Sequence, residues 1–217
     1  MGKSEFRSRL FDLAAAAPLL VWFSFSVGQL IKSISQTTER DGEWLSVCLQ
    51  LSNVILLSLL LALLIIRRPP IRKAHGVLPR AAGLVGLIIP SIAVVLPKAK
   101  LEIAPAVFSS ALMLFGTVAS IAICCWLGRS FSVLPQARGL VTNGPYRFVR
   151  HPLYAAELIS LLGFIWGFER PWSLVLMFVA TVAQFPRMRF EENILTEAFP
   201  SYREYANRTA RLIPGVY

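Results

Sequence analysis

Two stretches in the C-terminal part of the sequence carry side chains that could hold a polar ligand. In the first, His151 stands directly before Pro152, and Tyr154 follows three residues after His151. Proline is favoured at the first position of a helix, so we expect a helix to begin at Pro152 with His151 at its cap. The backbone N–H groups at such a helix start attract a carboxylate or phosphate. His151 and Tyr154 should project from one side of this helix start.

The second stretch begins at Arg187 and continues through Arg189, Glu191 and Glu192. The spacing of four from Arg187 to Glu191 and of three from Arg189 to Glu192 predicts a helix that presents both charges together. Taken singly, arginines at a membrane boundary are ordinary anchors, and exposed ion pairs contribute little. Charges at a membrane edge are nevertheless costly unless they are paired or bind something. The combination of the two stretches therefore favours a ligand-binding site.

The elements that must position these residues are apolar. The chain has 217 residues, of which 55% are hydrophobic and 16% are charged, and the charged residues fall between long apolar runs. A run of about 20 apolar residues is long enough to span a bilayer as a helix. The sequence therefore predicts an all-α, polytopic transmembrane helix bundle of about six apolar segments, at residues 10–31, 44–66, 81–96, 104–127, 152–168 and 171–186.

The last two apolar segments predict a short helical hairpin, which returns the chain to the side that it left. The loop at 128–150 and the amphipathic tail after 186 then share one face. Seventeen of the 22 Lys and Arg residues fall on this side, which we expect to be cytoplasmic and to hold both termini. We divide the chain into N-terminal transmembrane helices, 1–127, and a core that carries the site, 128–217. If the protein is bacterial, its membrane would be the inner membrane.

The net charge of +10 fits topology signals and contacts with membrane lipids better than nucleic-acid binding. Cys48, Cys124 and Cys125 lie in apolar runs without metal-ligand spacing. We expect all three cysteines to be buried as small apolar side chains, and we expect no metal site.

The motif Gly144-Pro-Tyr-Arg-Phe-Val-Arg-His-Pro-Leu-Tyr154 is followed, beyond two apolar segments, by Glu191-Glu192-x-x-Leu195 and then by Phe199, Tyr202 and Tyr205. In this order and spacing it resembles the isoprenylcysteine carboxyl methyltransferase family, within the wider group that includes membrane phospholipid methyltransferases. The resemblance implies a pocket for S-adenosyl-L-methionine at the cytoplasmic membrane face, without a Rossmann sheet. The sequence has no G-x-G-x-x-G after a strand-like run, which agrees.

The resemblance also implies roles for particular residues. Arg187 would face the substrate, and Glu192 is the second catalytic candidate. Glu191, with Glu192, would bind the amino group of the cofactor. The full set of candidate cofactor-binding residues is Gln136, Leu140, Val141, Tyr146, His151, Pro152, Tyr154 and Glu191. The loop that contains Gln136 and Arg138 is shorter than in the eukaryotic enzymes, and Pro200 replaces a common glycine.

The acceptor would be a lipophilic small molecule or lipid-linked group: a carboxylate, a thiol or a lipid amine. An ionised carboxylate or thiolate needs mainly positioning, whereas an amine needs a proton acceptor such as Glu157 or Glu192. One alternative is an NADPH-dependent membrane reductase of the sterol-reductase type, with Arg138, Arg147 and Arg150 available for the extra phosphate. The other is a non-catalytic scaffold or transport subunit, although the first four segments lack the charges that mark a transport path. The oligomeric state stays open.

Overall fold

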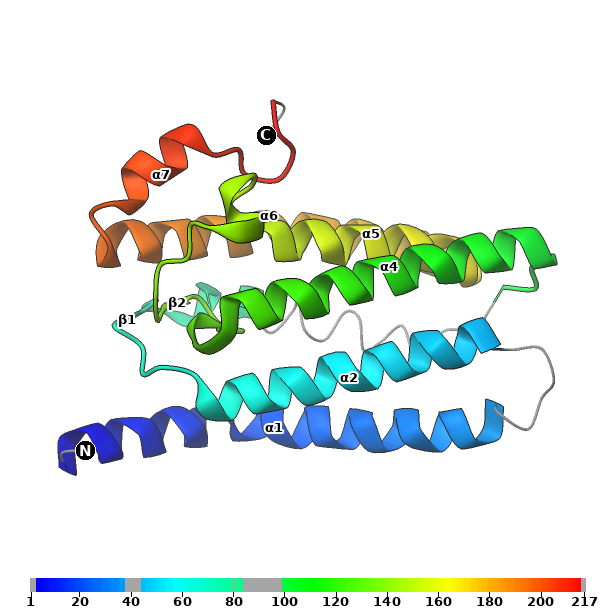
Figure 1. Cartoon of the computed structure of the whole chain (residues 1–217), viewed down its shortest axis with the longest axis horizontal. Coiled ribbons are helices and arrows are strands. Elements are labelled where there is room, and N and C mark those ends of the chain that lie inside the picture. The colour runs from blue at the N-terminus through cyan, green and yellow to red at the C-terminus, as the bar shows by residue number, and fades with distance from the viewer. Residues whose placement is uncertain (1–2, 38–43, 80, 84–98, 216–217) are drawn as a thin grey trace.

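The computed structural model of the chain describes residues 3–37, 44–79, 81–83 and 99–215. Helices dominate these residues, and two short strands pair beside them (Figure 1). In chain order, the elements are α1 (Lys3–Thr37), α2 (Trp44–Ile66), β1 (Arg72–Lys73), α4 (Ile103–Leu127), η2 (Gly128–Ser130), β2 (Gln136–Ala137), η3 (Gly144–Arg147), α5 (Pro152–Gly167), α6 (Trp172–Ala198) and α7 (Tyr202–Arg208).

Three helical segments among the described residues are long and apolar enough to cross a membrane: Ala16–Ser35, Trp44–Ile66 and Ile103–Ser130. α5 is apolar but shorter. Large apolar side chains such as Phe25 and Phe115 are 59% and 63% exposed on these helices, which suits a lipid environment. The predicted all-α membrane helix bundle is confirmed. The predicted segment 81–96 lies almost wholly outside the described residues.

Glycines set the distance between α4 and α5. A Cβ atom on Gly116 would lie 2.7 Å from the Ala156 carbonyl oxygen, and one on Gly163 would lie 2.6 Å from the Ser109 carbonyl oxygen. The Ser109 hydroxyl donates a 2.8 Å hydrogen bond to the Gly163 carbonyl. Small residues that let two backbones approach are a common device for packing helices in lipid. This packing fixes the start of α5, where the candidate site lies.

α4 packs against both α5 and α2, and α2 packs against α1. A buried apolar cluster joins α1, α2, α4 and the loop after α4, and consists of Leu19, Phe23, Leu63, Leu64, Cys124, Phe131 and Val133. The loop is also held by the antiparallel pairing of β1 with β2, in which Arg72 faces Ala137 and Lys73 faces Gln136. Cluster and strand pair together place the loop at one end of the bundle.

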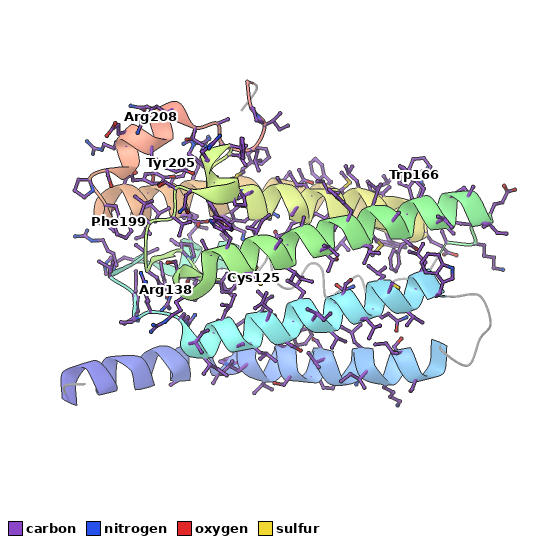
Figure 2. The ribbon with its side chains drawn as sticks, viewed as in Figure 1. Cys125, Arg138, Trp166, Phe199, Tyr205 and Arg208 are labelled. Atoms are coloured by element: carbon purple, nitrogen blue, oxygen red, sulfur yellow. The ribbon has the colours of Figure 1, made fainter. Side chains whose placement is uncertain are left out.

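That end of the bundle gathers the polar parts of the chain. The start of α1, the paired strands and α7 all lie there (Figure 1). Figure 2 shows Arg138, Tyr205 and Arg208 toward this end, and Trp166 toward the other. The arrangement agrees with the expectation that the loop after α4 and the C-terminal tail share one face.

The expectation that all three cysteines are buried is wrong for two of them. Cys124 is buried in the apolar cluster, whereas Cys48 and Cys125 are exposed. Successive residues on a helix point in directions about 100° apart, so Cys125 turns away from the cluster that Cys124 joins. All three thiols are free.

Candidate functional site

The start of α5 has the predicted form. Pro152 is the first helical residue and His151 is the cap. The His151 side chain is buried at 3% exposure, and its backbone N–H donates a 3.1 Å hydrogen bond to the Arg211 carbonyl. The cap residue is therefore fixed from two sides, by its own helix and by the C-terminal tail.

α6 continues without interruption through Pro186 into the charged stretch. Glu191 and Glu192 consequently lie on the same rigid element as the apolar residues that precede them. The Tyr154 hydroxyl donates a 3.0 Å hydrogen bond to Oε2 of Glu191. His151 Nε2 lies 3.0 Å from Oε1 of Glu192. The structure thus brings the two candidate stretches into direct contact.

Glu192 is the more enclosed of the two carboxylates, with a side chain 10% exposed. Its oxygens accept hydrogen bonds from Arg150 at 3.1 Å and from Arg211 at 2.9 and 2.7 Å, besides the contact with His151. Burial alone would raise the pKa of Glu192. The hydrogen bonds from His151 and Arg211, with the nearby charge of Arg150, outweigh burial and lower this pKa to about 2. Glu192 is therefore ionised and fully engaged.

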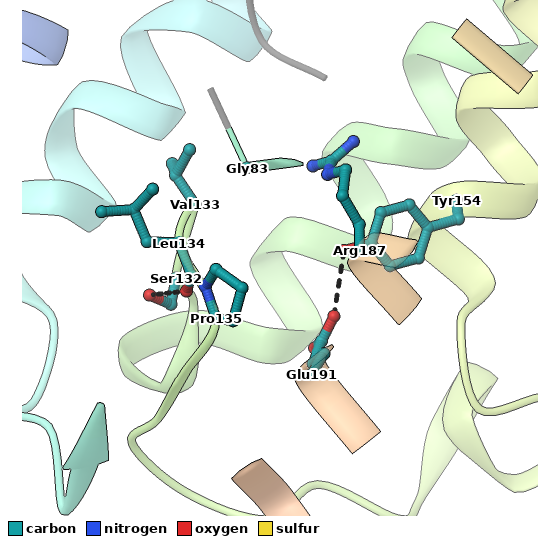
Figure 3. Close-up of a pocket in the computed structure, with 8 residues that line it drawn as sticks. All are labelled: Gly83, Ser132, Val133, Leu134, Pro135, Tyr154, Arg187 and Glu191. Atoms are coloured by element: carbon teal, nitrogen blue, oxygen red, sulfur yellow. Dashed lines mark hydrogen bonds between the residues drawn. The ribbon is translucent and has the colours of Figure 1, made fainter. Parts of the chain in front are cut away.

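Glu191 is in a different situation. Its side chain is 39% exposed, and His151 Nδ1 is 3.9 Å from Oε2 of this carboxylate. Glu191 lines a small, partly open cavity, together with Tyr154 and Arg187 (Figure 3). The cavity thus has a carboxylate, a phenol and a guanidinium in its wall, a set that can bind a ligand carrying both charges.

The opposite wall of the cavity comes from the loop after α4 and from Gly83. The loop contributes Ser132, Val133, Leu134 and Pro135. The Ser132 hydroxyl donates a 2.8 Å hydrogen bond to the Leu134 carbonyl, which keeps this turn compact. Sequence reasoning missed these residues. Pro135 was the only signal available, because a proline before β2 marks a bend in the loop.

Arg187 is buried at 8% exposure, and its partners orient it tightly. Its Nη1 atom donates a 2.9 Å hydrogen bond to Gln184 and lies 3.5 Å from a carboxylate oxygen of Glu157. Gln184 in turn donates a 2.7 Å hydrogen bond to Glu157. The guanidinium also lies over the Tyr154 ring, 4.8 Å from its centroid, in a cation–π contact. Arg187 therefore enters the cavity wall in a fixed orientation.

The remaining predicted residues are not among the described residues that line the cavity. Gln136 is in β2 and accepts a hydrogen bond from Arg138. Leu140 and Val141 are partly buried in the loop. Tyr146 lies in η3, where its carbonyl accepts a 2.6 Å hydrogen bond from the Tyr205 hydroxyl, and burial raises the pKa of its own phenol.

Several known proteins resemble the chain over its C-terminal part. Residues 105–201 match the phospholipid methyltransferase family model. The cobalt-zinc-cadmium resistance protein CzcN of Cupriavidus metallidurans is 38% identical over 76 residues, which are 35% of each chain. The nickel-cobalt-cadmium resistance protein NccN of Alcaligenes xylosoxydans xylosoxydans is 33% identical over 76 residues, 35% of this chain and 36% of that protein.

The protein-S-isoprenylcysteine O-methyltransferase A of Arabidopsis thaliana is 34% identical over 117 residues, 50% of this chain and 59% of the plant protein. The chain thus spans about a third of each resistance protein and 59% of the plant enzyme. Fold and matches together define a membrane protein related to the isoprenylcysteine and phospholipid methyltransferases. The resemblance recognised in the sequence is confirmed. In the part of the chain that the structure describes, no three His, Cys, Asp or Glu side chains gather to hold a metal ion.

Proposed function

We propose that this protein is an integral membrane methyltransferase that takes its methyl group from S-adenosyl-L-methionine and transfers it to a lipophilic acceptor. The observation that supports the proposal most strongly is the cavity between the loop after α4 and α6. Glu191, Tyr154 and Arg187 lie in its wall, beside the cap of α5. The site would face the cytoplasm, and in a bacterium the membrane would be the inner membrane.

The residues present suit the amino-acid end of this cofactor. Glu191 would accept hydrogen bonds from the ammonium group of the cofactor. The 3.0 Å hydrogen bond from Tyr154 would keep the Glu191 carboxylate oriented. The cavity is small, and its polar wall is formed by Glu191, Tyr154 and Arg187. It therefore suits one polar end of the cofactor, and Gln136, Leu140, Val141 and Tyr146 would flank the rest, with His151 and Pro152 at the α5 start.

When bound, the cofactor supplies an electrophilic methyl group on a sulfonium sulfur. The protein then has to position the acceptor and exclude water. Arg187 would orient the acceptor, because Gln184, Glu157 and Tyr154 hold its guanidinium in place. The shortness of α5 would let a lipophilic acceptor approach sideways from the bilayer.

Glu157 and Glu192 would play different parts with an amine acceptor. Glu157 is 35% exposed, close to Arg187, and could take up the released proton. The pKa of Glu192, lowered to about 2, makes that residue a weak proton acceptor at neutral pH. We assign Glu192 to positioning within the site. The labelling experiment described next distinguishes carboxylate, thiol and amine acceptors by the product that each would give.

The decisive experiment uses the full-length protein in detergent, methyl-labelled S-adenosyl-L-methionine and a lipid extract of the source cells. We expect a labelled lipophilic product, whose mass and fragmentation identify O-, S- or N-methylation. Binding of NADPH without binding of S-adenosyl-L-methionine would reject the proposal in favour of a reductase. Binding of neither, with no labelled product, would favour a scaffold or transport subunit.

A matched pair of variants tests the site itself. Glu191→Ala removes the cavity carboxylate. Glu197→Ala removes a carboxylate six residues further along α6, where it is 55% exposed in a surface ion pair with Arg72. We expect Glu191→Ala to abolish cofactor binding in calorimetry and Glu197→Ala to leave it unchanged. Equal affinity in both variants would place the cofactor elsewhere.

A further inference from the structure

The segment after α7 folds back onto the residues that precede α5. Ala210 forms a parallel bridge with Val149, and its carbonyl accepts a 2.8 Å hydrogen bond from the Arg150 N–H. The Arg211 carbonyl accepts the 3.1 Å hydrogen bond from the His151 N–H. We call residues 209–211 the C-terminal strap. Its backbone pairing places the Arg211 side chain next to the α5 cap.

Arg211 donates two parallel hydrogen bonds to Glu192. Its Nε atom is 2.9 Å from Oε1 and its Nη2 atom is 2.7 Å from Oε2. Such fork-to-fork pairs are both stronger and more directional than single hydrogen bonds. Arg150 adds a third hydrogen bond, to Oε1 at 3.1 Å. The plane of the Glu192 carboxylate is therefore fixed, with Oε1 toward His151.

The two ring nitrogens of His151 then have unequal surroundings. Nε2 is 3.0 Å from Oε1 of Glu192, which is hydrogen-bond distance. Nδ1 is 3.9 Å from Oε2 of Glu191, which is too far for a hydrogen bond. An ionised carboxylate only accepts hydrogen bonds, so the single proton of a neutral imidazole belongs on Nε2. Nδ1 is left with its lone pair on the Glu191 side.

We propose that Arg211 is a positioning residue that acts through Glu192 to hold the His151 imidazole with its proton on Nε2 and with Nδ1 as an acceptor beside Glu191. The tautomer follows from the contacts alone. Its use rests on the proposed function: Nδ1 and Glu191 form a pair of acceptors for one ammonium group of the methyl donor. Their 3.9 Å separation can be bridged by a nitrogen about 2.9 Å from each.

The tautomer can be measured directly, because the chain has two histidines, His75 and His151. His75 is exposed in the segment after β1, so His75→Gln leaves a single imidazole without touching the site. Nitrogen-15 NMR of this variant in detergent, labelled on histidine and recorded at pH 8, reports which ring nitrogen carries the proton. We expect protonation at Nε2 alone. Protonation at Nδ1, at both nitrogens, or a mixture of tautomers would overturn the proposal.

The role of Arg211 is tested by three substitutions on that background. Arg211→Met removes both hydrogen bonds to Glu192. Arg211→Lys keeps the positive charge but cannot form the paired hydrogen bonds of a guanidinium. Arg208→Met is the matched control, because Arg208 pairs with Glu204 at the surface, where the two side chains are 72% and 74% exposed. We expect a mixture of tautomers in Arg211→Met, a smaller change in Arg211→Lys and the wild-type spectrum in Arg208→Met. A wild-type spectrum in a folded Arg211→Met would refute the role of Arg211.

Donor affinity completes the test. Loss of a hydrogen bond to a charged group corresponds to a fall of roughly tenfold to a hundredfold, so calorimetry with S-adenosyl-L-methionine should show that fall for Arg211→Met. The affinity of Arg208→Met should equal that of the wild type. If the wild type does not bind this donor, the proposed function fails, while the NMR result still decides the tautomer. Unchanged donor affinity in Arg211→Met would refute the use of Nδ1 as an acceptor.

Discussion

Acid should weaken this protein through Glu192. The pKa of this carboxyl is about 2 in the folded protein, against an ordinary value of 4.5. A carboxyl with a lowered pKa stabilises the fold fully above its ordinary value, and this stabilisation is lost as the pH falls through 4.5 toward 2. Protonation of Glu192 would also remove the negative charge that Arg150 and Arg211 share, and so would weaken the attachment of the C-terminal strap.

The size of the effect follows from the shift in pKa. A shift of 2.5 units, from 4.5 to about 2, corresponds to roughly 3 kcal/mol of stability, of which about 2 kcal/mol is lost by pH 3. The Glu192 side chain is only 10% exposed, so little of this is given up to screening by solvent. A loss of this size is a large part of the stability of an ordinary domain.

Thermal unfolding in detergent micelles, between pH 6 and pH 3, tests this reasoning. Glu192→Gln has no carboxyl to titrate at this position. The difference in the free energy of unfolding between the wild type and Glu192→Gln should therefore shrink by about 2 kcal/mol as the pH falls from 6 to 3. Glu197→Gln, at the exposed ion pair with Arg72, should follow the wild type at every pH. Limited proteolysis should cut the C-terminal strap of the wild type faster at pH 3. A constant gap between Glu192→Gln and the wild type would refute the argument.

Other substitutions test packing and ligand contacts. Gly144→Ala should destabilise the fold by more than about 2 kcal/mol in thermal unfolding, because φ is +59° and the new Cβ would clash with the Trp126 ring. Gly128→Ala, at φ +51° in open space, should show only the backbone cost, and equal losses in the two variants would contradict this account. Gly163→Val should separate α4 from α5 and lower the melting temperature; an unchanged value would show that the close approach is dispensable. Tyr154→Phe should weaken cofactor binding in calorimetry by roughly threefold to tenfold through loss of its hydrogen bond to Glu191, and unchanged binding would mean that Tyr154 does not orient that carboxylate.

Local chemistry made part of the site predictable. Proline at a first helical position predicted the α5 start and the His151 cap, and both are present. The apolar runs predicted the long helices. These features depend on neighbouring residues only, so a single sequence contains them.

The division of labour between Glu191 and Glu192 was not predictable. Adjacent residues on a helix point about 100° apart, and which one faces a cavity depends on what packs against each. Arg211, a residue distant in sequence, reaches Glu192 only because the C-terminal strap pairs with the α5 cap. In the same way, the turn at residues 132–135 enters the cavity wall through the pairing of β1 with β2, which no local pattern reveals.

Because α6 is unbroken, the distance between its first turn and the cavity is fixed. Trp172 and Glu191 are nineteen residues apart on one helix, which is roughly 28 Å of axial rise and close to the thickness of the hydrocarbon layer. If the first turn of α6 lay at one surface of the bilayer, Glu191 would lie near the opposite headgroups. Arg187, which we propose to orient the acceptor, lies four residues before Glu191 on the same helix, so an acceptor anchored in the lipid by its tail would meet this guanidinium at one fixed height.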